Sequence, residues 1–193
     1  MPHDPISHFH ELWKTASKNT PLRQKNAVCV STINSDGFPE GRFVDLKEVD
    51  NNGFVFCSYL DSNKGKHILK NPKASMTIWW DHVGLQVRVV GYAHQISKQS
   101  ADKYWHGRSK SAQIATTCFA QSTPIDSEDQ ITKQFEEAMK EYESTSVPKP
   151  AAWGGYSISP SSIEILTFRE NRLHLREFYK RQTDEWDLTL LQP

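Results

Sequence analysis

The chain has 193 residues, and its 23 lysines and arginines balance 23 aspartates and glutamates. A net charge of zero argues against a general electrostatic footprint for nucleic acid or an anionic membrane, so any anion site must be local. No apolar run reaches the length of a membrane span, and the polar start of the chain has no signal-peptide pattern. The length fits one domain, which we expect to cover residues 1–193.

The three cysteines and eight histidines give no sign of a disulfide framework or a metal centre. Cys29, Cys57 and Cys118 are widely spaced and odd in number, which predicts buried free thiols in a reducing cytoplasm. The histidines are scattered apart from His8 and His10 and form no HExxH pattern, so no metal site is predicted.

The first half of the chain predicts one helix followed by antiparallel strands. Asp4 before Pro5 indicates a helix start, and apolar residues at helical spacing continue to about Ser17. Residues 41–66 predict a strand, a turn at 50–53, a second strand and then a helix capped by Ser62. Further strands are expected at 27–33, 73–80 and 85–96. Short polar connections between strands favour an antiparallel barrel or curled sheet, hence a mainly β fold with flanking helices.

The second half predicts helices and then a return to strands. Helices are expected at 97–107, at 109–119 and from Asp126 to about 143. The VPKP stretch at 147–150 prevents the last helix from continuing. The tail predicts strands at 156–159, 162–168, 172–181 and 186–191. No internal repeat is present.

Four places collect polar and charged residues that could bind a ligand. The first is the stretch 41–66, where a helix start favours an anion and basic side chains surround it. We interpret it as a phosphate cradle, although a solvated hairpin with surface lysines would be preferred if it stood alone. Its candidate ligands are Arg42, Lys47, Ser58, Asn63 and Lys64.

The next two places leave alternatives open. Gln86 is a single uncharged polar residue in a long strand; an exposed strand position is favoured over contact with a heteroaromatic ring. Tyr104 and Arg108 lie four residues apart, so on a helix they would converge on one anion. An ordinary basic helix end explains them equally well. Gln121 and Ser122 follow in a loop and would add neutral donors.

The fourth place is Arg172-Leu173-His174-Leu175-Arg176. Strand alternation would put the three basic side chains on one face and the leucines on a buried face. We favour a functional role over an exposed face that is balanced by acids such as Glu164.

Ten motifs in order resemble the pyridoxamine 5′-phosphate oxidase family. They are RFVDLK, SNKG, LQVRVVG, KYWHGR, AQIA, AQS, VPKPAAWGGY, IEIL, RLHLR and LLQP, and they extend over essentially the whole chain, from Asp4 to Pro193. The resemblance implies an FMN-binding antiparallel split β-barrel and a homodimer with FMN at the subunit interface. It further implies that oxygen oxidises pyridoxine or pyridoxamine 5′-phosphate to pyridoxal 5′-phosphate.

The resemblance also assigns roles residue by residue. Arg172 and His174 match the catalytic pair over the pyridine ring, and Lys47, Tyr104 and Arg108 match the substrate phosphate ligands. Gln86 and Arg176 match residues that face the flavin ring, and Gln121 and Ser122 match a contact contributed across the dimer. The full cofactor-binding set is Arg42, Lys47, Cys57, Ser58, Asn63, Lys64, Gln86, Gln121, Ser122 and Arg176.

The chain departs from the family pattern at several positions. We expect no N-terminal extension over the substrate, because the chain begins close to its first helix. The substituted positions are Asp45, Cys57, Asn63, Ala112, Leu166 and Leu175. Because several of these fall on the substrate side, two alternatives stay open: a related flavin oxidase on another ring substrate (phenazine-type), or a non-enzymatic FMN or B6-phosphate binder.

Overall fold

A computed structural model describes residues 4–18, 20–183 and 185–193. Met1–His3, part of the polar start discussed above, lie outside the described residues. None of the helices in the described part of the chain is long and apolar enough to cross a bilayer. The strands are β1 (Ala27–Ile33), β2 (Pro39–Asp50), β3 (Gly53–Tyr59), β4 (Lys73–Trp80), β5 (Leu85–Gln95), β6 (Trp153–Thr167), β7 (Leu175–Arg181) and β8 (Trp186–Leu191).

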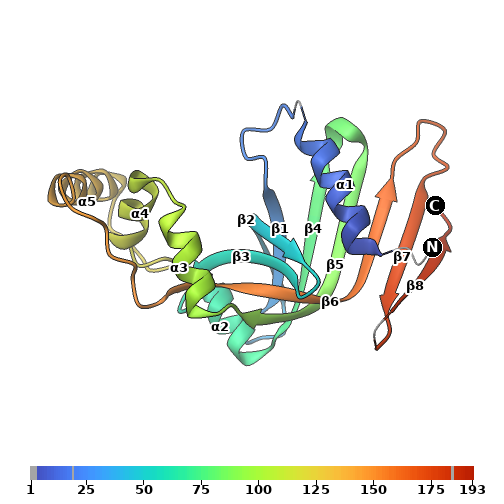
Figure 1. The fold of residues 1–193 in the computed structure, drawn as a ribbon. Helices are drawn as coiled ribbons and strands as arrows, with labels where there is room; N and C mark the ends of the chain where they lie inside the picture. The colour runs from blue at the N-terminus through green and yellow to red at the C-terminus, as the bar shows by residue number, and fades with distance from the viewer. Residues whose placement is uncertain (1–3, 19, 184) are drawn as a thin grey trace.

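Six of these strands close an antiparallel barrel, which confirms the predicted fold class. They neighbour one another in the order β3-β2-β1-β4-β5-β6, and pairing of β3 with β6 closes the ring. Beyond the barrel, β7 and β8 continue the sheet from the second half of β6 and extend to one side (Figure 1). Closure gives every barrel strand a neighbour on both sides along part of its length.

The barrel core follows from the period of two in its strands. In β5, Leu85, Val87 and Val89 are buried while Arg88 and Val90 point outward. α1 (Pro5–Ser17) crosses one side of the barrel (Figure 1) and inserts Phe9, which is fully buried against the rings of Phe54 and Trp80. Asp4 caps this helix by accepting hydrogen bonds from the amides of Ile6 and Ser7, as predicted.

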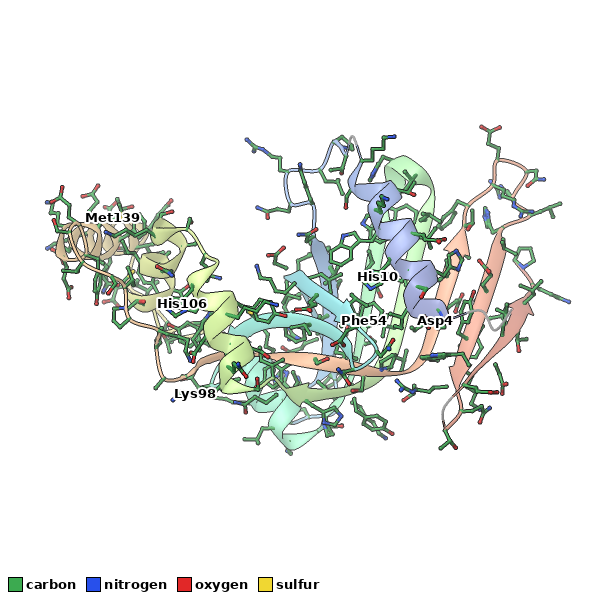
Figure 2. All side chains as sticks on the ribbon, in the orientation of Figure 1. Asp4, His10, Phe54, Lys98, His106 and Met139 are labelled. Carbon is green, nitrogen blue, oxygen red and sulfur yellow. The ribbon has the colours of Figure 1, made fainter. Side chains whose placement is uncertain are left out.

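Three of the remaining helices, within residues 98–141, lie on the opposite side from β7 and β8 (Figure 1). They form a second apolar cluster centred on Trp105 and Trp153, whose rings pack edge to face at 5.0 Å. Figure 2 places Met139 at the outer end of this helical region, far from His10 on α1. The helices are α2 (Asn63–Lys70), η1 (Asp81–Val83), α3 (Lys98–His106), α4 (Lys110–Thr117) and α5 (Glu128–Glu141).

The structure confirms the hairpin and corrects several predicted boundaries. Asp50 accepts hydrogen bonds from the amides of Asn52 and Gly53, which closes the turn between β2 and β3. The two predicted strands at 156–159 and 162–168 are one strand, β6, because an irregularity opposite Val90 and Gly91 absorbs the interruption at Pro160.

The helix predicted after Ser62 does begin at Asn63, but its predicted side-chain cap is wrong, and one other helix start and one strand start are wrong as well. The Ser62 hydroxyl makes no capping hydrogen bond, because it donates to the Tyr59 carbonyl instead. α5 is capped by Ser127 and not by Asp126. The strand expected from residue 172 begins at Leu175, because Arg172 has a positive φ of 62° in a turn.

Candidate functional site

A cavity of about 770 Å³ lies where the β2–β3 hairpin, the start of α2 and the α4 region meet. Its volume falls in the usual range for small-molecule sites. Cationic and neutral donors from distant parts of the chain line it, together with apolar walls from Val44, Phe119 and Trp153. The predicted cofactor ligands that line it are Arg42, Cys57, Ser58, Asn63, Lys64, Gln121 and Ser122. We call this cavity the hairpin pocket.

Lys64 is the centre of a hydrogen-bond cluster in the hairpin pocket. Its ammonium group donates to the Ser58 hydroxyl at 2.9 Å, the Ser62 hydroxyl at 3.1 Å and Gln121 Oε1 at 3.1 Å. Only 8% of the residue is exposed. Burial, and then the positive charge of Arg42, lowers the pKa of Lys64 to about 8. A bound anion would therefore favour the charged form of this lysine.

Arg42 is held beside Lys64 by a buried hydroxyl. Its Nη1 donates to Thr32 Oγ1 at 2.6 Å, and Nη2 pairs with Glu40 at 3.3 Å. Thr32 is fully buried and also lies 3.0 Å from His67 Nδ1 on α2. The guanidinium is thus fixed by β1 and α2 together.

A second cavity of about 510 Å³ adjoins the first. All three predicted substrate-phosphate ligands line it, namely Lys47, Tyr104 and Arg108. Asp45 and Arg108 line both cavities and therefore form their common wall. We call this second cavity the β2–α3 pocket.

Arg108 has a fixed position at the wall between the two pockets. It follows the end of α3, and not a continuous helical face as predicted, yet it still reaches the same pocket as Tyr104. Its guanidinium lies over the rings of Trp105 and Trp153, 5.9 and 5.6 Å from their centroids. Nη2 donates to the Ala112 carbonyl at 3.0 Å and to Thr116 Oγ1 at 2.8 Å.

The donors of the hairpin pocket fit the phosphate and ribityl groups of FMN. Three cationic side chains, Arg42, Lys64 and Arg108, line it together with hydroxyl and amide groups, which is the donor set that a phosphomonoester and a polyol chain require. Within the described residues, Arg108 Nε is buried without a hydrogen-bond partner. A buried unpaired donor at this wall is consistent with an anionic or oxygen-bearing ligand.

The other predicted flavin contacts lie on the outer face of the sheet. Gln86, Leu166 and Arg176 are direct cross-strand neighbours on β5, β6 and β7. Buried Glu164 accepts a hydrogen bond from Arg88 and another, at 2.9 Å, from Arg176 Nε. Burial raises the pKa of Glu164, but the bonds from the two arginines outweigh it and leave the pKa below its usual value. Glu164 thus balances the charge of Arg176, as predicted by the alternative of an exposed strand face that is balanced by acids.

Arg172 and His174 do not share a strand face with Arg176. Both lie in the turn before β7, and His174 Nδ1 accepts the Arg169 amide at 3.1 Å while its ring lies 4.9 Å from that of Phe168. Leu173, predicted to be buried, is 61% exposed. Neither Arg172 nor His174 lines the hairpin pocket or the β2–α3 pocket.

Three further expectations can be compared with the structure. Gln121 and Ser122, expected to contribute a contact across a dimer, line the hairpin pocket of their own chain, where Gln121 bonds to Lys64. Lys47, predicted for both ligands, lines only the β2–α3 pocket. The three cysteines are unpaired, but each is half-buried and not fully buried. Burial raises the pKa of the Cys57 thiol to about 11, so it lines the pocket as a neutral group.

Sequence reasoning missed Thr32, Glu48 and Thr116, which hold Arg42, Tyr104 and Arg108. No pattern in the nearby sequence identifies the partner of any of the three, because each partner belongs to another element. The period of two in β1 does place Thr32 among buried apolar neighbours, and a hydroxyl there signals a partner.

Comparisons with known proteins agree with this geometry. A family model described as pyridoxamine 5′-phosphate oxidase matches residues 16–140. A second, described as the pyridoxine 5′-phosphate oxidase C-terminal dimerisation region, matches residues 153–193. This second match covers β6, β7 and β8, the strands that carry Glu164 and Arg176.

Individual relatives cover nearly the whole chain. The pyridoxine/pyridoxamine 5′-phosphate oxidase of Pelagibacter ubique is 37% identical over 98% of this chain and 92% of its own length. The protein of the same name from a Shewanella species is 37% identical over 100% and 91%. The crystal structure of PhzG from Burkholderia lata, in complex with tetrahydrophenazine-1-carboxylic acid, has a TM-score of 0.92 at 27% identity and covers 100% of this chain and 94% of its own. The chain belongs to the pyridoxamine 5′-phosphate oxidase family.

Proposed function

We propose that this protein is an FMN-dependent oxidase that converts pyridoxamine 5′-phosphate or pyridoxine 5′-phosphate to pyridoxal 5′-phosphate, with oxygen as the electron acceptor. The observation that carries the proposal is the pair of adjoining pockets. Each has its own cationic donors, Lys64 in one and Lys47 in the other, and they share the wall formed by Asp45 and Arg108. A cofactor phosphate and a substrate phosphate can therefore be held separately, with their rings meeting between them.

In the hairpin pocket, Arg42 and Lys64 would hold the cofactor phosphate, and Ser58, Asn63, Gln121 and Ser122 would add neutral hydrogen bonds. The Cys57 thiol would contact the cofactor as a neutral side chain. When bound, FMN supplies the two-electron acceptor for substrate oxidation. The chain contributes binding and orientation, because its cationic groups are already fixed before the ligand arrives.

In the β2–α3 pocket, Lys47, Tyr104 and Arg108 would hold the substrate phosphate. Burial, and then the hydrogen bond that Tyr104 donates to Glu48, raises the pKa of this phenol. Tyr104 therefore stays protonated, and its single O–H would have to turn from Glu48 to the phosphate to serve as a donor there. It does not act as a base at neutral pH.

The ring contacts would come from a second copy of the chain. Arg172 and His174 would orient the substrate ring, and Gln86 and Arg176 would face the flavin ring. All four lie on the outer sheet face or the turn beside it, away from both pockets of their own chain. The match of residues 153–193 to a dimerisation region supports a homodimer in which this face meets the partner's pockets. The unpaired cysteines support a reducing, cytoplasmic setting.

The test is spectroscopic. The purified protein, supplied with FMN, is mixed without oxygen with pyridoxine 5′-phosphate, and in parallel with pyridoxine, which lacks only the phosphate. We expect the flavin absorbance to bleach with the phosphate ester, to recover on admission of air, and to change much more slowly with pyridoxine. A flavin that stays oxidised with pyridoxine 5′-phosphate, and in a further sample with pyridoxamine 5′-phosphate, would refute the proposed substrate. It would leave an oxidase of another ring substrate or a non-enzymatic FMN binder as the alternatives.

A second candidate function is the oxidation of a carboxylated, partly reduced tricyclic ring. The likeness to PhzG bound to tetrahydrophenazine-1-carboxylic acid favours it, and so does Ala112, which brings no hydroxyl to the β2–α3 pocket. The same anaerobic assay with a reduced phenazine carboxylate separates the two candidates, because only the true substrate class bleaches the flavin rapidly.

A further inference from the structure

The β2–α3 pocket contains an ion pair that its role in binding an anion does not require. Lys47 Nζ lies 2.5 Å from Asp45 Oδ2, and both side chains line the pocket. The two residues are separated by one position on β2, so strand alternation puts them on the same face. The Lys47 side chain is 26% exposed and that of Asp45 is 51% exposed, so the pair faces the open side of the pocket.

The other donors of this pocket also have partners within the chain. Tyr104 donates to Glu48, which Lys103 approaches at 3.5 Å, and Arg108 donates to Ala112 and Thr116. Among the described residues that line the pocket, Asp45 is the one carboxylate, and it shares that lining with the cationic residues Lys47, Lys103 and Arg108. It therefore reduces the positive charge at the place where a substrate anion would bind.

We propose that Asp45 is a specificity-determining residue, which lowers the positive charge of the β2–α3 pocket so that a singly charged anion is favoured over a phosphate dianion. The proposal rests on the proposed function for the assignment of this pocket to the substrate anion. Its physical basis is direct: Lys47 keeps other N–H groups for a ligand, but the neighbouring carboxylate repels each negative charge that the ligand brings. The repulsion energy is about twice as large for a dianion as for a monoanion such as a carboxylate.

The test is Asp45→Asn in the FMN-loaded protein, which keeps the shape of the side chain and removes its charge. KM for pyridoxine 5′-phosphate is measured at about pH 8, where the phosphate is a dianion, and at about pH 5.5, where it is largely a monoanion. We expect KM to fall by about fivefold at the higher pH and by about twofold or less at the lower pH, with kcat changing less than KM. A purely structural role would not produce this dependence on ligand charge.

Asp102→Asn is the matched control, because it removes a carboxylate that pairs with Lys149 at 3.3 Å outside both pockets. It should leave KM unchanged at both pH values. Asp45→Ser is the second variant, in case the amide of asparagine forms a new bond with Lys47. If both Asp45 variants leave KM at the wild-type value at about pH 8, or lower it equally at both pH values, the proposal is overturned.

A binding measurement separates this proposal from the proposed function. Pyridoxal 5′-phosphate is titrated into the FMN-loaded protein and the flavin fluorescence is followed, which needs no turnover. Tighter binding in Asp45→Asn, again larger at about pH 8, supports the role of Asp45 even if no B6 phosphate is oxidised. Unchanged binding in a protein that does oxidise them overturns the role of Asp45 alone.

Discussion

Lys64 in the hairpin pocket and the arginines of the outer sheet face are held in opposite ways. Lys64 is buried among neutral oxygen atoms from Ser58, Ser62 and Gln121, and no carboxylate of the described residues bonds to it. On the outer face, Arg88 and Arg176 share the buried carboxylate of Glu164. The first arrangement leaves a positive charge uncompensated, and the second neutralises most of it.

This difference separates a binding site from a structural contact. A lysine that is buried without a counter-ion has a lowered pKa, and an incoming anion is the missing partner. An arginine pair that is already bonded to a carboxylate has less to gain from a free anion. This contrast supports the proposals that the hairpin pocket binds a phosphate and that the outer face contacts a second subunit.

The largest effect is expected from Gly65→Ala, which breaks the pocket side of this comparison. A Cβ on Gly65 would lie 2.0 Å from the Leu60 carbonyl oxygen, and backbone cannot move aside cheaply. We expect the free energy of unfolding to fall by more than about 3 kcal/mol, measured by urea denaturation. Gly107→Ala is the control: its added Cβ meets only ordinary contacts at 3.7 Å, so stability should change by less than about 1 kcal/mol.

A smaller effect is expected from Lys64→Met, which sharpens the comparison by removing the uncompensated charge. We expect FMN affinity to fall by about 10- to 100-fold, because a charged hydrogen bond to phosphate is lost. Quenching of FMN fluorescence on binding gives the dissociation constant. Lys66→Met removes an exposed lysine from the same helix and should leave the affinity within about twofold.

The pH dependence of the same titration provides an internal check. Because the pKa of Lys64 is about 8 without ligand, the wild-type protein holds its proton below that pH and loses it above. FMN affinity should therefore be greatest near neutral pH and fall as the pH rises through about 8. Lys64→Met should lack this decline; an equal decline in both proteins would assign it to another group.

The smallest of these effects is expected from Glu164→Gln, on the outer face. Glutamine keeps an acceptor but removes the charge between Arg88 and Arg176, so unfolding should become easier by about 1–2 kcal/mol near neutral pH. The folded-state pKa of Glu164 is lowered, so its stabilisation is present above about pH 4.3 and is lost as the pH falls through the folded-state value.

Urea titrations at one protein concentration, near neutral pH and at acid pH, measure this difference. Glu170→Gln changes an exposed carboxylate in the turn after β6 and should have no effect at either pH. A difference between Glu164→Gln and the wild type that persists unchanged in acid would show that the glutamate charge is not responsible.

The sequence predicted the elements well wherever local patterning decides them. Alternation in β5, the turn at Asp50 and the cap at Asp4 are all confirmed, because each depends on neighbours within a few residues. Residues 172–174 were predicted as the start of a strand, since Arg172, His174 and Arg176 alternate with leucines. A left-handed backbone at Arg172 ends that pattern, and side-chain alternation cannot reveal it.

The candidate site, too, could be predicted only where nearby residues in the sequence decide it. The members of the hairpin pocket were named from a compact motif and a loop, and they do line one cavity. Their supporting partners were not: Thr32 and Thr116 reach the site from β1 and α4 through tertiary contacts. The split between two pockets also depends on where α3 ends, which places Arg108 at the wall.

The pairing of β6 with β3, which closes the barrel, has a consequence for how the chain folds. β3 pairs with the first part of β6, so Phe54 meets Ile158 across about 100 intervening residues. The loop that must close is long, and its closure entropy opposes this pairing until both strands exist. During synthesis the first five barrel strands therefore emerge with the edge of β3 open, and the ring closes only after the helical region has been made. A ribosome stalled before Trp153 would carry a sheet with an unprotected edge, which favours pairing with other chains.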